Sequence, residues 1–306
     1  MAGAVTGSQV RRLSLLLLVT ATVVGTATDR STRRPPLVLG GLQVIAADFH
    51  VHSSMWSANG VTPWGLVLEA ERQGLDALAV TGHNQVLDSK IARWFSRAIG
   101  GPTVLTGEEI HALEHHIIAV GIERMVDWRQ PAAAQLDEVH GQGGLAIAAH
   151  PLKSFWPGFD AAARARLDGT EVCHPMIYMG DRYQEELERF AAQVPAAAIG
   201  SSDFHGLGRL GMCRTYVFAR ANTAEAILDA IRAKRTVVYG RAGAAYGDPA
   251  LVALAETRPE LREAATRDRA RSALDWVAIA AGLAGLMGLV ATRPIAYPAA
   301  SPEVPS

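Results

Sequence analysis

The sequence predicts an α/β fold in which a parallel sheet closes into a barrel. Between residues 43 and 240, short apolar runs typical of buried strands alternate with segments of helical character. This alternation repeats roughly seven times, which favours a closed barrel over an open sheet. Histidines and carboxylates at the strand ends, described below, indicate that one face of this barrel carries the chemistry.

The expected strands are runs rich in alanine, valine, isoleucine and leucine. In chain order they cover residues 44–47, 77–80, 103–105, 116–120, 145–149, 170–172, 196–199 and 215–218. Helices are expected between most of them, at residues 63–73, 89–99, 131–140, 181–193 and 223–234. Pro63 and Pro131 fit the first turn of a helix, because that turn does not use their missing N–H.

Two apolar segments lie outside this region. Arg11 and Arg12 precede an apolar run at residues 13–24, the plan of a signal peptide that is also nearly long enough to remain as an anchor. Residues 276–290 are wholly apolar, which predicts a transmembrane helix at 273–292. A buried helix of the main domain is the alternative for this second segment.

These features divide the chain into five parts. We expect a signal peptide or membrane anchor with its linker at 1–40, one domain at 41–245, a basic linker at 246–272, the transmembrane helix at 273–292 and a tail at 293–306. The protein is therefore expected at the membrane of a bacterial-type cell envelope. Arginines that flank the apolar segments favour a cytoplasmic domain, whereas the signal-like N-terminus favours export.

Composition excludes several classes of protein. Hydrophobic residues make up 49% of the chain and charged residues 19%, which excludes a disordered chain. The net charge of −1 provides no basic field, so no stable nucleic-acid partner is expected. Cys173 and Cys213 are too few for a disulfide framework or a cysteine-based zinc site, and we interpret them as buried thiols.

Histidines and carboxylates lie at the ends of nearly every expected strand. They are His50, His52, His83, Glu109, His116, His150, Asp203 and His205. The carboxyl ends of strands in a parallel barrel share one face, so these side chains should converge. Imidazole and carboxylate together bind Zn²⁺, Mn²⁺ or Fe²⁺. His50 and His52 are two residues apart, so both point to the same side of their strand, which favours a multinuclear metal site.

In these residues the chain resembles the PHP (polymerase and histidinol phosphatase) family of phosphoesterases. The matching motifs are DFHVHS at 48–53, TGHN at 81–84, GEE at 107–109, HP at 150–151 and SDFH at 202–205, together with His116. The resemblance covers about residues 44–240. It implies a distorted (β/α)7 barrel that holds two or three divalent metal ions.

The resemblance also implies which residues bind each metal. His50, His52, Glu109 and Asp203 would hold one ion, and Glu109 would bridge to a second ion bound by His116 and His150. His83 and His205 would belong to a third. Asn59 stands where the family usually has an Asp or His ligand, and Gly82 where it usually has Asp.

The implied function is that of a metal-dependent hydrolase. It would cleave a phosphate ester of a small metabolite, nucleotide or lipid head group through metal-activated water, with His205, His83 and Asp203 as catalytic residues. Lys153, Arg209 and Arg214 would bind the phosphate oxygens. An amidohydrolase-type enzyme and a non-catalytic, membrane-tethered module of the same fold are the alternatives. We interpret the remaining histidines His111, His140 and His174 as core residues. His115, next to His116, is equally compatible with a core residue and with a ligand. Glu171 is interpreted as a carboxylate that supports a ligand.

Overall fold

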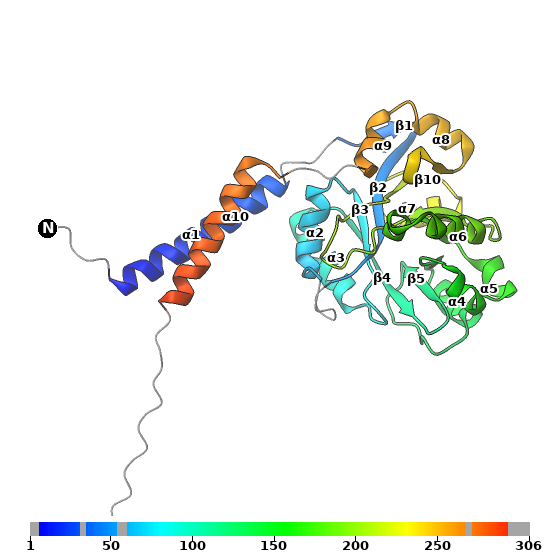
Figure 1. The fold of residues 1–306 in the computed structure, drawn as a ribbon, viewed down its shortest axis with the longest axis horizontal. Helices are drawn as coiled ribbons and strands as arrows, with labels where there is room; N and C mark the ends of the chain where they lie inside the picture. Colours follow the sequence, from blue (N-terminus) through cyan, green and yellow to red (C-terminus); the bar gives the residue numbers. More distant parts are fainter. Residues whose placement is uncertain (1–5, 31–34, 54–59, 267–270, 293–306) are drawn as a thin grey trace, which may run out of the picture. The chain divides into compact units, whose positions relative to one another are not determined.

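The computed structural model of the 306-residue chain describes residues 6–30, 35–53, 60–266 and 271–292. The chain divides into two compact units. One combines Met1–Ser31 with Ala270–Ser306, and the other is Thr32–Arg269. The first contains two long helices, and the second contains the sheet and its surrounding helices (Figure 1).

The larger unit is built on one eleven-stranded sheet, ordered β11-β10-β9-β2-β3-β4-β5-β6-β7-β8 with β1 beside β2. The strands are β1 (Leu37–Leu39), β2 (Leu42–Val51), β3 (Ala77–Val80), β4 (Thr103–His111), β5 (His116–Val120), β6 (Leu145–Ala148), β7 (Gly169–Cys173), β8 (Ala197–Gly200), β9 (Thr215–Ala219), β10 (Thr236–Tyr239) and β11 (Ala245–Gly247). Every strand expected from the sequence is present. The predicted α/β fold is confirmed.

Helices surround this sheet (Figure 1). They are α2 (Pro63–Arg72), α3 (Leu87–Ile99), α4 (Ala132–Gly141), α5 (Ala161–Arg166), α6 (Asp181–Ala191), α7 (Ala224–Arg232), α8 (Pro249–Ala255) and α9 (Pro259–Thr266), with 3₁₀ turns η1 (Lys153–Gly158), η2 (Pro175–Met179) and η3 (Arg241–Gly243). Helix α3 packs on β4, α4 on β6, α6 on β7 and α7 on β9. The stretch expected as a basic linker thus contains α8 and α9.

The barrel is brought towards closure at β8 and β9 by a side chain. The Thr215 hydroxyl accepts from the Gly200 N–H and donates to the Gly200 carbonyl, both at 2.8 Å. Glycine is needed here, because a Cβ at Gly200 would collide with the carbonyl oxygen of Cys213. This close approach aligns the end of β8, which leads into Asp203, with the rest of the barrel.

The expectation of a parallel barrel is wrong at several strands. Strand β5 is antiparallel to β4 and β6, and β9 is antiparallel to β2. The chain between His111 and His116 is too short for the crossover that a parallel pair requires, so β4 and β5 form a hairpin. As a result His116, at the start of β5, lies at the same end of the barrel as the carboxyl ends of the parallel strands.

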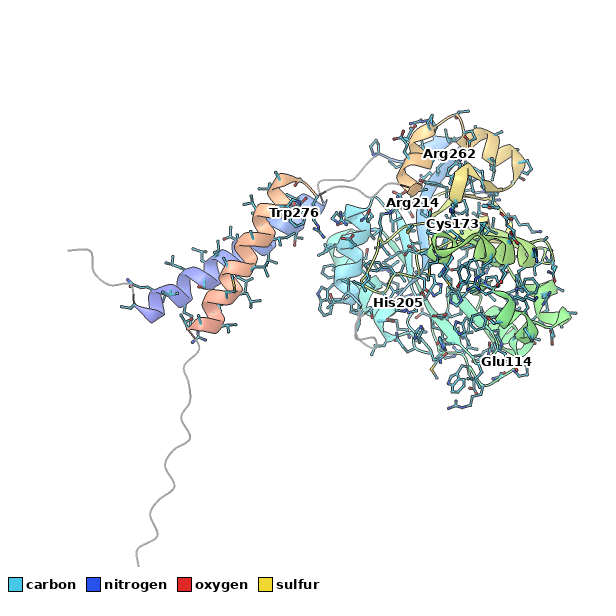
Figure 2. All side chains as sticks on the ribbon, viewed as in Figure 1. Glu114, Cys173, His205, Arg214, Arg262 and Trp276 are labelled. Carbon is cyan, nitrogen blue, oxygen red and sulfur yellow. A yellow bond between two sulfur atoms is a disulfide. The ribbon has the colours of Figure 1, made fainter. Side chains whose placement is uncertain are left out.

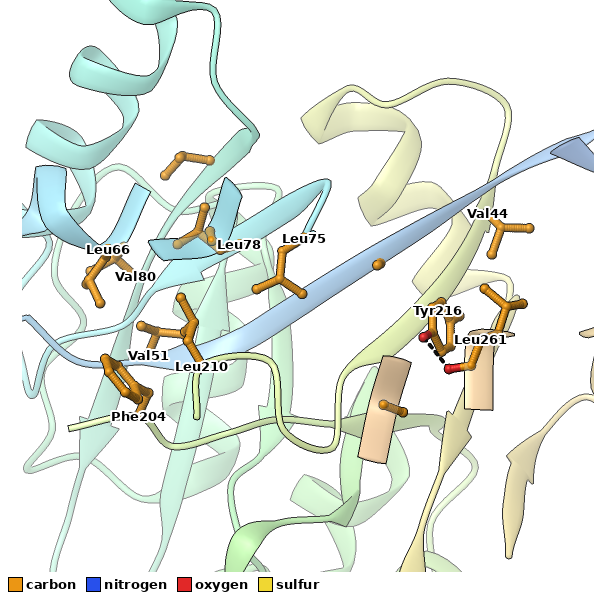
Figure 3. Close-up of a cluster of buried hydrophobic side chains, with 14 of the residues drawn as sticks. Val44, Val51, Leu66, Leu75, Leu78, Val80, Phe204, Leu210, Tyr216 and Leu261 are labelled. Carbon is orange, nitrogen blue, oxygen red and sulfur yellow. Dashed lines mark hydrogen bonds between the residues drawn. The ribbon is translucent and has the colours of Figure 1, made fainter. Parts of the chain in front are cut away.

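An apolar cluster links the sheet to the helices on its outer side. In Figure 3, Leu66 of α2, Leu78 and Val80 of β3, and Phe204 are drawn together with Tyr216 of β9. The Tyr216 hydroxyl donates to the carbonyl of Leu261 at 2.5 Å. Helix α9 is thereby part of the domain's core, which is why residues 259–266 do not behave as a linker.

The interpretation of the two cysteines as buried thiols is wrong. Cys173, at the end of β7, and Cys213, just before β9, form a disulfide (Figure 2). Their Cα atoms are 5.4 Å apart although 40 residues separate them in the chain. The bond joins the end of β7 to the segment that follows Asp203 and His205.

The smaller unit is an antiparallel pair of helices, α1 (Gly7–Arg30) and α10 (Ala273–Ala291). Both are long and apolar enough to cross a membrane by length and composition. A methyl group added at Gly285 would lie 2.7 Å from the Ser14 carbonyl oxygen, so this small residue allows close packing. Helix α10 packs on α1, and the alternative of a core helix of the main domain is therefore wrong.

Candidate metal centre

The predicted histidines and carboxylates come together at one end of the barrel. Among the described residues, five groups of three ligand atoms lie within 4.8 Å of one another. Two of them join His174 to His50 and His150, and His111 to His83 and Glu109. The other three are His50, His52 and Asp203; Glu109, His116 and His150; and His52, His83 and His205. They are contributed by β2, β4, β5 and the segments that follow β3, β6 and β8. Together these three sets contain the eight residues that the family resemblance implies as metal ligands.

Glu109 lies between two of these sets. Its Oε2 atom is 2.9 Å from His83 Nε2 and 3.3 Å from His50 Nε2. Its Oε1 atom is 2.9 Å from His116 Nδ1 and 3.3 Å from His150 Nε2. Each oxygen of one buried carboxylate therefore faces a different group of imidazoles, the geometry that a bridging ligand requires.

Asp203 completes the first set through one of its oxygens. Asp203 Oδ1 is 3.1 Å from His50 Nε2 and 3.0 Å from His52 Nε2. Asp203 and His150 both have positive φ angles, 44° and 27°, which non-glycine residues rarely adopt. Such backbone strain is concentrated at functional sites, where the surrounding structure holds it in place.

The converging atoms lack hydrogen-bond partners among the residues that the structure describes. His50 Nε2, His52 Nε2, Glu109 Oε1 and Asp203 Oδ1 are all buried and unpaired in this sense. Unpaired buried polar atoms cost free energy, and lone pairs that point at one another also repel. A divalent cation between them would remove both costs, so this donor set fits the metal that the family resemblance implies.

Hydrogen bonds to the opposite ring nitrogens orient two of the histidines. His50 Nδ1 is 3.0 Å from Glu171 Oε1, so the Nδ1 proton is donated and the Nε2 lone pair faces Glu109 and Asp203. His205 Nδ1 donates to the Asp203 carbonyl at 2.9 Å, which leaves its Nε2 lone pair available. Glu171 also accepts from the backbone N–H of His150 and thus supports two members of the cluster.

The charges of the cluster are coupled. Burial lowers the pKa of His50, but the nearby carboxylates, above all Asp203, outweigh burial and raise this pKa well above its ordinary value. Burial raises the pKa values of Glu109 and Asp203, yet His50 and the neighbouring imidazoles hold both well below their usual range. Burial lowers the pKa of His52 to about 4. The carboxylates are thus ionised and His52 is neutral, the forms that bind metals, whereas His50 would release its Nε2 proton on binding a metal ion.

Two rim histidines are more accessible. The His83 side chain is 43% exposed and that of His205 36% exposed, while His50 and His52 are buried. The hydrogen bond to Glu109 raises the pKa of His83 against the opposing effect of burial. Solvent therefore reaches His83 and His205 but not His50 and His52.

Two of the three predicted phosphate-binding cations, Arg209 and Arg214, are engaged away from this cluster. Arg214 is 2% exposed and donates to the backbone carbonyls of Gly211 and Gln73, while Arg209 donates to those of Ala264 and Ala265. Figure 2 shows Arg214 and His205 at separate places in the domain. The structure thus contradicts Arg214 and Arg209 as substrate contacts, because their guanidinium groups hold backbone carbonyls elsewhere. The exposed Lys153 follows His150 closely on η1, and Asn59 lies outside the described residues.

Two histidines beside the cluster, His174 and His111, are absent from the predicted ligand set. His174, interpreted as a core residue, has its ring centroid 5.2 Å from that of His150 and bonds to Asp203. His111 is exposed, with its ring 3.9 Å from that of His116. His174 follows β7 directly, as His150 follows β6 closely, and this position was the signal available in the sequence. His115 bonds instead to Gln135 and His140 to Asp168, as structural histidines do.

Comparisons with known proteins agree with this geometry. A family described as PHP-associated matches residues 182–236, which include Asp203 and His205. The resemblance to the PHP family is confirmed. An uncharacterized protein of Methanocaldococcus jannaschii is 26% identical over 137 residues, covering 41% of this chain and 80% of that protein.

A solved structure shares the PHP-type fold. It is a two-domain protein from Bacteroides vulgatus, described as containing a predicted PHP-like metal-dependent phosphoesterase. It aligns with a TM-score of 0.51 and 23% identity over 68% of this chain and 68% of its own. At this level of identity the likeness concerns the fold.

Proposed function

We propose that this chain is a metal-dependent hydrolase of phosphate esters. The observation that carries the proposal is the position of Glu109, whose two oxygens face separate groups of imidazoles. This arrangement supports a pair of bridged divalent ions, either Zn²⁺, Mn²⁺ or Fe²⁺, with a third held by the rim histidines. Bridged metal pairs are a recurring solution for phosphoryl-ester hydrolysis.

Different residues of the chain would bind the two metal ions. His50, His52 and Asp203 would hold one ion, and His116 and His150 the other. When bound, the ions would activate a water molecule and neutralise charge on the phosphoryl group. Glu171 keeps His50 in the tautomer that presents Nε2 to the site.

The rim of the site would handle the substrate. His83 and His205 are the accessible imidazoles, and either, when protonated, can donate to the leaving alkoxide. Lys153 is the remaining predicted cation for the phosphate oxygens. The substrate class stays that of a small phosphorylated metabolite, nucleotide or lipid head group.

The alternative is a hydrolase that uses the same cluster on an amide. The observation that favours it is the engagement of Arg209 and Arg214 with backbone carbonyls, since these arginines would otherwise have bound phosphate. Both reactions need the same ligands, so the substrate assay separates them.

The test compares both reactions on one preparation. Full-length protein in detergent, stripped with chelator and reloaded with Mn²⁺, is assayed with p-nitrophenyl phosphate and with p-nitroacetanilide. Mn²⁺-dependent release from the phosphate ester, lost in Asp203→Ala but kept in the distant control Asp168→Asn, is the expected result. Release only from the anilide supports the amide hydrolase, and metal binding without either reaction refutes both.

We also propose that α1 and α10 form a membrane hairpin with the domain on the oxidising side. The antiparallel packing places Gly7 of α1 and Ala291 of α10 at the same end of the hairpin. Disulfides such as Cys173–Cys213 persist in oxidising compartments. Green fluorescent protein fused after Ser306 should fluoresce, because both ends would be cytoplasmic. A dark fusion with a reduced Cys173–Cys213 pair would contradict this topology.

A further inference from the structure

His174 belongs to none of the motifs that the resemblance matched, although one of its ring nitrogens lies within 4.8 Å of ligand atoms of His50 and His150. It follows Cys173, the last residue of β7, and its side chain is 4% exposed. A residue of the cluster can bind a metal itself or hold a ligand in place. His174 contacts the carboxylate of one proposed ligand, Asp203. Its role therefore depends on which ring nitrogen carries the proton.

The 3₁₀ turn η2 fixes the tautomer of His174. The backbone N–H of Met176 donates to His174 Nδ1 at 3.2 Å, so that the imidazole caps the start of the turn. A backbone amide is always a donor, so Nδ1 must accept. In the neutral ring the proton then resides on Nε2.

The protonated nitrogen points at Asp203. His174 Nε2 is 3.2 Å from Asp203 Oδ2, while the other oxygen, Oδ1, faces His50 and His52. A donor on Oδ2 fixes the rotation of the carboxylate and leaves Oδ1 for the metal. Because both ring nitrogens have partners, His174 supports the ligand instead of acting as one.

The surrounding structure also fixes the positions of His174 and Asp203 relative to each other. Asp48 accepts from the N–H groups of Ser202 and Gly211, which fixes the backbone on both sides of Asp203. The disulfide joins Cys173, next to His174, to Cys213 at the far end of the same loop. The distance from His174 to Asp203 is thus set by two elements besides the hydrogen bond itself.

We propose that His174 is a positioning residue that aims the Asp203 carboxylate at the metal. The inference rests on the proposed metal centre and goes beyond it, since it assigns a role to a residue outside the predicted ligand set. Partners of metal ligands typically contribute 10–100-fold to metal affinity.

Two substitutions separate the role of His174 toward Asp203 from its role in capping η2. The amide oxygen of asparagine can replace Nδ1 as the acceptor for Met176, but its side chain is too short to donate to Asp203. The amide nitrogen of glutamine can replace Nε2 as the donor, but its oxygen is displaced from the capping position. His174→Asn therefore keeps the cap, and His174→Gln keeps the bond to Asp203.

The experiment measures binding of Mn²⁺ alone to metal-free, full-length protein by calorimetry, with thermal unfolding of the metal-free chains as the folding control. We expect His174→Asn to bind Mn²⁺ about 10–100-fold more weakly and His174→Gln to stay within about threefold of the unmodified chain. Equal affinity in a folded His174→Asn variant would overturn the inference, and so would a weak His174→Gln beside an unaffected His174→Asn.

A double substitution tests whether His174 acts through Asp203. In an Asp203→Ala background, His174→Asn should lower the affinity no further, because the carboxylate that it positions is gone. A further loss would show that His174 binds the metal directly and would overturn the positioning role. Phosphatase activity is not a readout here, so failure of the proposed reaction is seen separately, as Mn²⁺ binding without turnover.

Discussion

The two ends of the barrel contain the same residue types, histidines and carboxylates, but differ in how these side chains are hydrogen-bonded. At the end where β3 and β7 begin, Asp76 accepts from the Ala46 N–H at 2.9 Å and Asp168 from the Ala146 N–H at 2.8 Å. Asp168 also bonds to His140. At the opposite end, the inner atoms of His50 and Asp203 converge without hydrogen-bond partners among the described residues.

This difference distinguishes residues that stabilise the fold from residues whose polar atoms need a bound cation. A buried carboxylate that accepts backbone N–H groups is satisfied within the protein. A buried carboxylate that faces several lone pairs needs a cation. Substitutions at the two ends should therefore change different properties, activity at the histidine cluster and stability at the other end.

The largest effect is expected for Asp203→Ala at the cluster. Loss of a metal ligand removes several kcal/mol of transition-state stabilisation, so kcat/KM for an aryl phosphate should fall by about 10³-fold or more. Asp168→Asn at the other end is the matched control and should keep kcat/KM. An active Asp203→Ala enzyme would break the comparison.

Substitution of Glu108 can show whether burial of a carboxylate is enough to make it a metal ligand. It is the neighbour of Glu109, it is buried, and it accepts from the Val126 N–H at 2.6 Å. Burial raises its pKa to about 7, so the folded state favours the protonated acid and the chain loses stability as the pH rises through about 7.

Glu108→Gln removes this titration. Between pH 5 and pH 8 the free energy of unfolding should shift in favour of the variant by about 2–3 kcal/mol, at about 1.4 kcal/mol per pKa unit. Urea unfolding at both pH values measures this, and Mn²⁺ affinity should be unchanged. A pH-independent difference in stability between the two chains would refute the role of burial.

Metal removal should act on the cluster alone. Mn²⁺ at 100 times its dissociation constant should stabilise the folded chain by about 2.7 kcal/mol, because it binds the folded state. Thermal unfolding with and without chelator measures this shift, which Asp168→Asn should keep and Asp203→Ala should lose. An equal shift in both variants would mean that Mn²⁺ binds elsewhere.

The smallest effect is expected for Asp168→Ala. It leaves the Ala146 N–H and His140 without their partner, which should cost about 1–3 kcal/mol of stability. Urea unfolding measures the loss, and activity per folded chain should be unchanged. A large loss of kcat with normal stability would contradict a purely structural role.

Much of the cluster is predictable from local pattern. The spacing of His50 and His52 places both side chains on one side of the chain at the end of β2. Asp203 and His205 follow β8 within five residues, so their convergence follows from the order of the strands. His174 also follows the end of a strand, but it belongs to none of the motifs that identified the other residues. The direction of the Arg214 side chain and the Cys173–Cys213 disulfide depend on contacts distant in sequence, which no local pattern contains.

The measurement that tests the central claim most directly is the metal content per chain. Full-length protein purified with Mn²⁺ is compared with Glu109→Gln, in which the bridging carboxylate loses its charge. We predict two or more ions per chain in the unmodified protein and fewer in the variant. One ion or none in the unmodified protein, or equal content in both, would contradict a centre bridged by Glu109.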